Sequence, residues 1–170
     1  KMSTILENIN TILNGDFVKG ESQEEFQEKG FRKSFRFSNL ASGLKTFVIL
    51  KKLLQNGVLV EKGVLILDEP EVHLHPQWIV EYARLLVLIH KTLGTKLILA
   101  SHDPDFIAAI KAIAKREEVL EETNFYISSS EEQECSYRYN FKWLGKDIEP
   151  IFESFNIALE RIQQYGDTDI

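Results

Sequence analysis

The string V-L-I-L-D-E-P, from Val64 to Pro70, constrains the fold of this 170-residue chain more than any other feature. Four apolar residues in a row are typical of a strand buried on both faces, as the strands of a parallel sheet are. Ligands of open α/β sheets bind beyond the carboxyl ends of such strands. The run therefore predicts that Asp68 and Glu69 lie at a ligand-binding edge. The alternative is a strand that happens to end in an acidic turn.

Two adjacent carboxylates at such an edge can divide the work of phosphoryl transfer. Asp68 is predicted to orient Mg²⁺, usually through water, and Glu69 to polarise the attacking water. Neighbouring residues at a strand end point in different directions, so one carboxylate can face a metal while the other faces water.

Strand and helix patterns alternate through the middle of the chain. The predicted order is helix 44–55, strand 64–67, helix 76–93, strand 97–100 and helix 104–115. Proline suits the first position of a helix and glycine the position after its end, which is why Pro76 and Gly94 set the limits of the long helix. The first helix is apolar nearly all round and is predicted to be buried. The alternation predicts an α/β fold with a parallel sheet.

The flanking segments are predicted to hold a few antiparallel strands. Residues 17–19 and 31–37 are expected to pair around a polar tip at 21–30, after a weakly helical start. Residues 125–127 are predicted to form a short strand, followed by a polar loop at 128–134.

An alternating strand is predicted from Cys135 to Trp143, ahead of a last helix that Pro150 opens. Its aromatic residues fall on one face, and its cations and small polar residues fall on the other. Aromatic side chains separated in this way from cations favour a strand packed on a core over a surface that stacks on bases.

Two further strings lie on either side of the acid pair. Residues 39–45 read N-L-A-S-G-L-K ahead of a helical pattern, and residues 96–104 read K-L-I-L-A-S-H-D-P, an apolar strand followed by polar residues. In this order the three strings resemble the C-terminal half of an ABC-type ATPase domain, a P-loop NTPase fold, with signature motif, Walker B and H-loop. The continuation E-P-E-V-H-L-H-P is similar to the stand-alone AAA-like ATPases grouped with the overcoming-lysogenization-defect (OLD) and RecF relatives. The resemblance covers residues 39–110 firmly and the flanks loosely.

The resemblance implies a role for the residues after the second strand. His102 would contact the γ-phosphate of ATP, because an imidazole can donate to a phosphate oxygen near neutral pH. The alternative is a capping or core histidine. Ser101 would orient the same region, and Asp103 would cap the helix that follows.

The resemblance also assigns the Ser42–Gly43 turn and Lys45 to the nucleotide. Backbone N–H groups and the dipole of the following helix favour an anion at this turn. In ABC-type dimers it caps the γ-phosphate bound to the opposite subunit. The string departs from L-S-G-G-Q, because Ala41 and Leu44 replace a serine and a polar residue. The alternative is a plain capped helix.

Residues 71–76 occupy the place of the family's D-loop, with His75 where an aspartate is usual. The resemblance implies that His75 contacts the other subunit across a dimer interface. His73 and His75 without a third ligand nearby are a weak signal for a metal site.

No G-x-x-x-x-G-K-[ST] string occurs in the 170 residues. Without that loop there is no backbone cradle for phosphates and no lysine on the β- and γ-phosphates. We therefore expect the chain to be the C-terminal part of one ATP-binding domain, inactive when isolated, that lacks its N-terminal P-loop lobe. Residues 1–38 would be a hairpin region, 39–115 the motif-bearing core and 116–170 the C-terminal strands and helix. The sheet should then have an unpaired edge.

The resemblance implies a cytoplasmic ATPase that uses ATP and Mg²⁺ and works as a nucleotide-driven homodimer switch, with DNA repair or phage defence beside a nuclease as context by analogy. The net charge of −6 disfavours a dominant nucleic-acid surface in this piece, although DNA remains a partner to consider for the full protein. The single cysteine fits a reducing cytosol, and no apolar run approaches the ~20 residues that span a bilayer.

Two other functions stay open. One is a non-catalytic dimerisation or regulatory module, or a split subunit without its own P-loop. The other is the ATP-binding subunit of a transporter, against which the H-L-H-P string at 73–76 and the altered signature argue.

Overall fold

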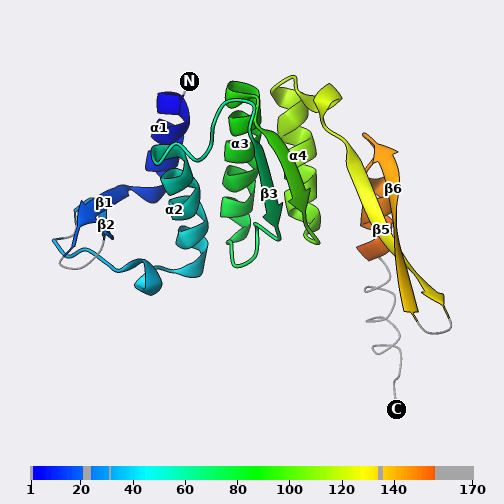
Figure 1. Cartoon of the computed structure of the whole chain (residues 1–170), viewed down its shortest axis with the longest axis horizontal. Helices are drawn as coiled ribbons and strands as arrows, with labels where there is room; N and C mark the ends of the chain where they lie inside the picture. Colours follow the sequence, from blue (N-terminus) through cyan, green and yellow to red (C-terminus); the bar gives the residue numbers. More distant parts are fainter. Residues whose placement is uncertain (1, 21–23, 31, 134–135, 156–170) are drawn as a thin grey trace, which may run out of the picture. The chain divides into compact units, whose positions relative to one another are not determined.

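The computed structural model describes residues 2–20, 24–30, 32–133 and 136–155 (Figure 1). The chain divides into two compact units, Lys1–Ile113 and Ala114–Ile170. The first unit holds α1 (Met2–Leu13), β1 (Gly15–Lys19), β2 (Glu24–Glu28), α2 (Ser42–Gln55), β3 (Val64–Asp68), α3 (Pro76–Leu93), β4 (Lys96–Ala100) and most of α4 (Pro104–Arg116). The second unit holds the end of α4, β5 (Phe125–Gln133) and β6 (Ser136–Gly145).

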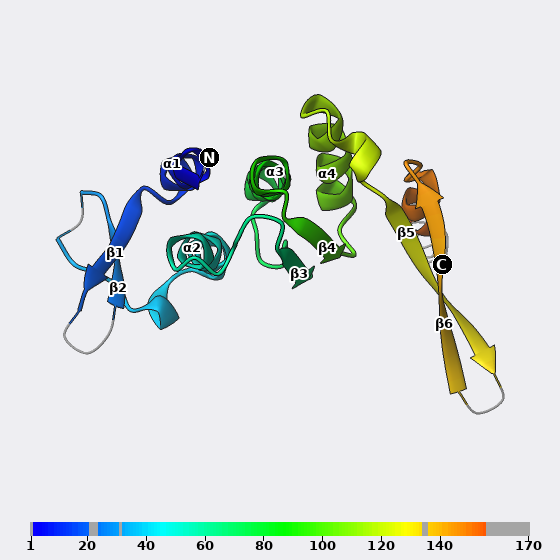
Figure 2. The ribbon, with the colours of Figure 1, turned by 45° about the horizontal axis from the view of Figure 1, so that its top comes forward.

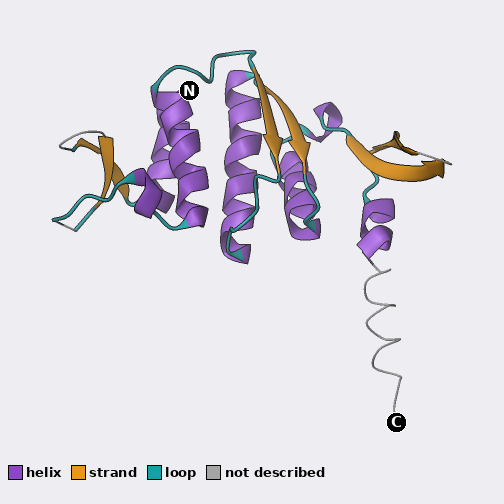
Figure 3. Cartoon of the chain, turned by 60° about the horizontal axis from the view of Figure 1, so that its bottom comes forward, coloured by secondary structure: helices purple, strands orange, loops and turns teal. Residues whose placement is uncertain are grey.

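The centre of the first unit is a parallel pair of strands joined by a helix. β3 and β4 run side by side in the same direction (Figure 3), in a register that places Val64 opposite Lys96 and Asp68 opposite Ala100. The connection between them contains α3, as parallel strands require a long crossover. The predicted α/β fold with a parallel sheet is confirmed. Because the described sheet has two strands, each has an unpaired edge, also as predicted.

The prediction that these strands are buried on both faces is wrong. Along both strands the exposed and half-buried positions alternate. Val64, Ile66 and Ile98 share one face and are 60%, 69% and 56% exposed. The reason lies in the layers, since α3 covers one side of the pair (Figure 2) and no described element covers the other.

α3 follows the predicted limits closely. His75 caps its start, Pro76 occupies the first turn, and Gly94 ends it with a left-handed φ of 66°. Glycine pays no Cβ penalty in that conformation. The predicted apolar face is buried except at Trp78, which is half-buried; its members are Trp78, Tyr82, Leu85, Leu86, Ile89 and Leu93.

α2 packs against α3 through aromatic rings. The ring of Phe47 meets those of Trp78 and Tyr82 edge-on, with centroids 5.4 and 5.3 Å apart. α1 joins the same layer, because Arg84 of α3 donates to Asn8 over 2.8 Å. The prediction that the first predicted helix is buried all round is wrong at Ile49, which is 49% exposed on the side away from these contacts.

The N-terminal hairpin differs from the prediction. β1 pairs with β2 in antiparallel register, from Gly15 opposite Glu28 to Lys19 opposite Glu24. The second strand thus lies inside the stretch predicted to be a polar tip. Of the predicted strand 31–37, the described part, residues 32–37, contributes a single bridge, between Phe35 and Phe26. The polar composition concealed β2 because only Phe26 of that strand is apolar and buried.

The second unit is built on a long antiparallel hairpin. β5 runs through Gln133, so the polar loop predicted at 128–134 is a strand over its described part. The predicted packing of the aromatic strand on a core is wrong for Tyr139, Phe141 and Trp143, which are 67%, 75% and 64% exposed. Alternation identified the strand but could not reveal that no described element covers its aromatic face.

Two predicted elements extend beyond the described residues. The predicted strand begins at Cys135, which is not described. The predicted last helix is described over residues 149–155, which include Pro150, and its continuation lies outside the described residues. Among the described helices, none is both long and apolar enough to cross a membrane.

Candidate functional site

The carboxyl ends of β3 and β4 bring the acid pair and His102 to one edge. Asp68 ends β3 opposite Ala100, and the Glu69 N–H donates to the Ala100 carbonyl over 2.9 Å. Beyond this bond, Nδ1 of His102 lies 2.9 Å from Oε1 of Glu69. These side chains are 69% and 52% exposed, so a ligand can reach both. The structure thus brings together two of the residues proposed for catalysis, and places the proposed metal ligand Asp68 beside them.

Glu69 has an unusual backbone. Its φ is +44°, a left-handed conformation in which a residue with a Cβ is strained by about 1–3 kcal/mol. A turn follows at once, in which the Val72 N–H donates to the Glu69 carbonyl over 3.1 Å. Strain of this kind clusters at active sites. The left-handed φ also turns Glu69 out of the strand direction that Asp68 follows.

A second acid in the same loop is buried. Glu71 is 4% exposed, and the hydroxyl of Ser101 donates to its Oε1. The sequence prediction gave Ser101 a role but none to Glu71. The available signal was the acid that follows Pro70 in the D-E-P-E string, although its burial could not be inferred from position alone.

Asp103 caps α4 as predicted. Its Oδ1 accepts the Phe106 N–H over 2.8 Å, and its own N–H donates to the Ser101 hydroxyl over 3.1 Å. The side chain is thereby engaged in holding the helix start, which leaves His102 as the exposed polar group at the end of β4.

Ser42 and Gly43 are the first two residues of α2 rather than a turn ahead of it. The residue before them, Ala41, makes no side-chain cap, so the first N–H groups of the helix have no side-chain acceptor there. Gly43 lies against the loop after the acid pair, because a Cβ at this position would stand 3.1 Å from the His73 carbonyl oxygen and 3.5 Å from Leu74. Glycine therefore permits the close approach of α2 to that loop.

Two other proposed residues are engaged locally. The Lys45 ammonium donates to the Ser38 carbonyl over 3.0 Å and lies 5.9 Å from the Phe37 ring centroid. Its present contacts are therefore with the segment before α2. Nδ1 of His75 accepts the Gln77 N–H over 3.4 Å, a contact that caps α3.

Within the described residues, no group of three or more His, Cys, Asp or Glu side chains is placed to hold a metal ion. A magnesium ion does not require such a group, since it is usually held by one or two carboxylates together with waters and substrate phosphates. The exposed carboxylate of Asp68 at the strand end fits that donor set.

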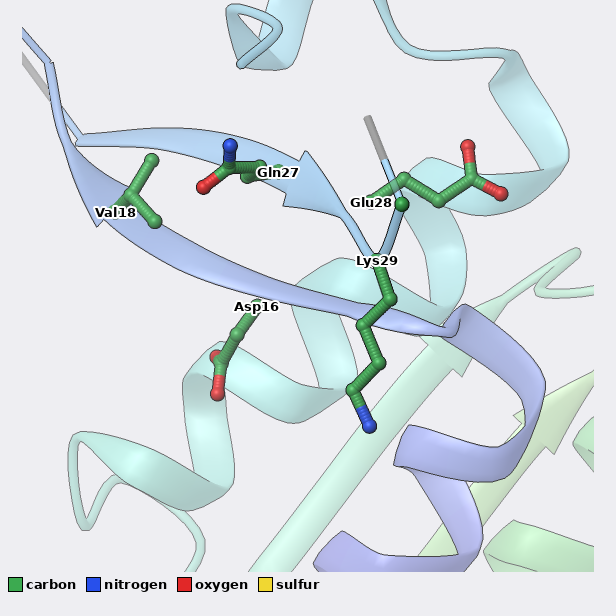
Figure 4. Close-up of a pocket in the computed structure, with 6 residues that line it drawn as sticks. Asp16, Val18, Gln27, Glu28 and Lys29 are labelled. Atoms are coloured by element: carbon green, nitrogen blue, oxygen red, sulfur yellow. The ribbon is translucent and has the colours of Figure 1, made fainter. Parts of the chain in front are cut away.

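The β1–β2 hairpin carries a separate hollow of about 360 Å³ (Figure 4). Asp16 and Lys29, at its border, project to the same side of the hairpin. Asp16 is already paired, because the buried Lys51 places its ammonium 2.8 Å from the Asp16 carboxylate and 3.0 Å from the Gly15 carbonyl. Partial burial alone would raise the pKa of Asp16, but hydrogen bonds from Lys51 and Phe17 and the charge of Lys51 lower it. We therefore interpret these contacts of Lys51 as a structural clamp that holds the β1–β2 hairpin to α2.

Comparison with known proteins points to ATPases. Residues 3–108 match the model of the family described as "AAA domain, putative AbiEii toxin, Type IV TA system". Over 58 residues, 34% of this chain, the sequence is 47% identical to the energy-coupling factor transporter ATP-binding proteins EcfA2 and EcfA3 of Clostridium perfringens strains. The match covers 20% of each relative, so the chain spans about a fifth of the length of these curated relatives.

Two solved structures share the fold. One comes from work described as "Structural biochemistry of ATP-driven dimerization and DNA stimulated activation of SMC ATPases" and aligns with 89% of this chain and 91% of its own, with a TM-score of 0.51. The other is the SmcHead bound to the C-winged helix domain of ScpA, which aligns with 87% of this chain and 45% of its own, with a TM-score of 0.53. Each is 13% identical in sequence, a likeness that concerns the fold alone.

Proposed function

Because the chain belongs to the AAA domain family whose model matches residues 3–108, an ABC- and AAA-like group of ATPase domains, we propose that it is the C-terminal lobe of an ATP-hydrolysing enzyme. The observation that carries this proposal is the pair formed by Glu69 and His102, 2.9 Å apart at the carboxyl ends of adjacent parallel strands. Ligands of open α/β sheets bind at this edge.

Glu69 is the proposed general base. Its carboxylate is exposed and held by a strained backbone at the strand end, where it can orient and polarise a water molecule for attack on the γ-phosphate. His102 is the proposed γ-phosphate contact. Since it now lies against Glu69, it can donate either to that carboxylate or to an arriving phosphate oxygen.

Asp68 is the proposed ligand of Mg²⁺, directly or through water. When bound, the ion would neutralise the negative charge that develops on the phosphates during transfer. The role of this chain would be to present one exposed carboxylate, that of Asp68, next to the proposed base.

Ser42 and Gly43 are proposed to serve the nucleotide of an opposite subunit. Their position at an uncapped helix start supports this role, because the N–H groups and the dipole there favour an anion. Lys45 is proposed to act at the same place, which requires it to leave the Ser38 carbonyl.

The P-loop is proposed to come from a complementary lobe outside these 170 residues. The chain aligns with 45% of the SmcHead chain, so more than half of that relative lies outside the alignment. The exposed apolar face of β3 and β4 supports the same idea, because a sheet in an α/β domain is normally covered on both faces.

At the level of the assembly, we propose a nucleotide-driven homodimer switch with DNA or an effector such as a nuclease as partner. The solved SMC ATPase, for which ATP-driven dimerization and DNA-stimulated activation are described, supports this extension by fold alone. A transporter ATP-binding subunit is the second candidate, favoured by the 47% identity to the energy-coupling factor proteins over 58 residues.

The test is phosphate release from Mg-ATP by the natural protein that contains this chain. Asp68→Ala and His102→Ala should each lower the rate by about 10²–10⁴-fold, as expected for loss of a catalytic group. Glu7→Gln, an exposed change on α1, should leave it unaltered. A natural protein that binds and hydrolyses no ATP, or variants as fast as the wild type, would refute the proposal.

A further inference from the structure

We propose that Glu71 is a positioning residue that keeps Glu69 and His102 at the right distance from each other. The hydrogen bond from the Ser101 hydroxyl to Glu71 Oε1 forms a clasp between the loop after β3 and the residues after β4. We call this contact the Glu71–Ser101 clasp. Its role in catalysis rests on the proposed hydrolysis of ATP, whereas its role in holding the two loops does not.

The clasp has one buried end and one half-buried end, whereas both side chains of the contact that it supports are exposed. Glu71 is 4% exposed, whereas Glu69 and His102 are 52% and 69% exposed. An exposed pair contributes little to structure, because water screens the charges and the side chains lose entropy when they are held. A hydrogen bond to a buried carboxylate is stronger and fixes geometry better. The clasp, rather than the outer pair, therefore sets the distance between the loops.

The second carboxylate oxygen of Glu71 is unusual for a buried polar atom. Oε2 is buried and has no hydrogen-bond partner among the described residues. Buried polar atoms are nearly always paired, and an unpaired one costs about 1–3 kcal/mol. Departures of this kind are expected at functional sites, where position matters more than stability. An acid that served the fold alone would be better replaced by an apolar residue.

Both ends of the clasp are anchored to regular structure. On one side, the Ser101 hydroxyl also accepts the N–H of Asp103, the residue that caps α4. On the other side, the Leu74 N–H donates to the Glu71 carbonyl over 2.9 Å, which closes the loop ahead of α3. The clasp thus joins the starts of two helices, and the two residues proposed for catalysis lie within two positions of it in the sequence.

The clasp also reaches the start of α2. Residues 71–74 form one turn. The His73 carbonyl oxygen in this turn lies so close to Gly43 that a Cβ added to Gly43 would stand 3.1 Å from it. A shift of Glu71 therefore moves the turn against which α2 begins. Loss of the clasp should disturb the loop after β3, the end of β4 and the start of α2 together.

The variants that test the clasp are Glu71→Ala, Ser101→Ala, the double change, and Glu71→Gln, all in the natural protein. Glu71→Gln keeps an acceptor for Ser101 and should retain most of the activity. Each alanine variant should lower kcat for ATP by about 10–100-fold, as is usual for residues that orient a catalytic group. KM should stay within about twofold. The double variant should be no slower than the single ones, because both remove the same contact.

Amide hydrogen exchange without nucleotide supplies a readout independent of ATPase activity. Glu71→Ala should speed exchange at the Glu69 and Asp103 amides by about tenfold or more, since the bonds that these amides donate depend on the clasp. Glu71→Gln and the exposed control Glu7→Ala should not. Unchanged exchange at both amides in Glu71→Ala would overturn the proposal. If the exchange changes but the wild type hydrolyses no ATP, the clasp stands and the proposed function fails.

Discussion

At the residue scale, one charged side chain of α2 is held inside the packed layer. Lys51 is 1% exposed, yet its ammonium has two partners, the Asp16 carboxylate and the Gly15 carbonyl. These contacts fasten the β1–β2 hairpin to α2. The sequence did not reveal them, because one lysine in an otherwise apolar helix does not indicate which residues 35 or so positions earlier it meets.

Replacing Lys51 with methionine should destabilise the protein by about 1–3 kcal/mol, because the Gly15 carbonyl is left without its donor. Urea unfolding followed by circular dichroism would measure the change. Lys19→Met, an exposed substitution on the same hairpin, should cost less than about 0.5 kcal/mol. Equal effects of the two substitutions would show that Lys51 is no clamp.

The Asp16–Lys51 pair also predicts a pH dependence. The folded-state pKa of Asp16 lies below the ordinary value of 3.8, so the unfolded chain binds the proton more readily. The stability contributed by the pair is therefore fully present above about pH 3.8 and is lost as the pH falls through the lower folded-state pKa. The difference in unfolding free energy between wild type and Asp16→Asn should shrink on acidification from pH 5 to about pH 2. A difference that is constant over this range would contradict the pairing.

At the scale of elements, the predictions were good where a periodic pattern and its end signals agreed. Pro76 and Gly94 fixed the ends of α3, and the two apolar runs found β3 and β4. The predictions failed where polar residues form strands, as in β2 and in β5 beyond Ile127, because local composition there favours loops over the cross-strand pairing that the structure contains. Burial of the apolar strands was misjudged for another reason, since burial depends on which layers are present.

The exposed face of β3 gives a prediction at this scale. Ile66→Ala should cost well under 1 kcal/mol in the 170-residue chain, because Ile66 is 69% exposed there. Leu85→Ala, at a fully buried position of α3, should cost about 2–5 kcal/mol. In the natural protein the cost of Ile66→Ala should rise to about 2 kcal/mol or more if the complementary lobe covers this face. Thermal unfolding of both variants in both chains would measure this, and an unchanged cost would mean that the face stays uncovered.

At the scale of the whole molecule, the sequence identified the candidate site better than its surroundings. The order of the three strings placed Asp68, Glu69 and His102 at one edge, and the structure has Glu69 and His102 in contact there. The partner of Ser101 was missed, because Glu71 is 30 residues away in the chain and only the fold brings them together.

The proposed dimer switch predicts that trapped nucleotide produces a larger assembly. With Glu69→Gln, Mg-ATP should convert the natural protein from monomer to dimer in sedimentation, because hydrolysis no longer reopens the interface. Adding Ser42→Arg, which places a bulky side chain at the proposed nucleotide contact, should prevent this. A mass that does not respond to ATP would argue against the switch while leaving hydrolysis itself to be tested.

The most direct test of ATP hydrolysis at the edge of β3 and β4 is the turnover of Glu69→Gln beside that of the wild type, in the natural protein, with ATP affinity measured in parallel. If Glu69 is the general base, the rate should fall by about 10²–10⁴-fold while the Kd for ATP changes by less than about threefold. Turnover equal to that of the wild type would remove Glu69 as the base and would contradict the assignment of this edge as the catalytic site.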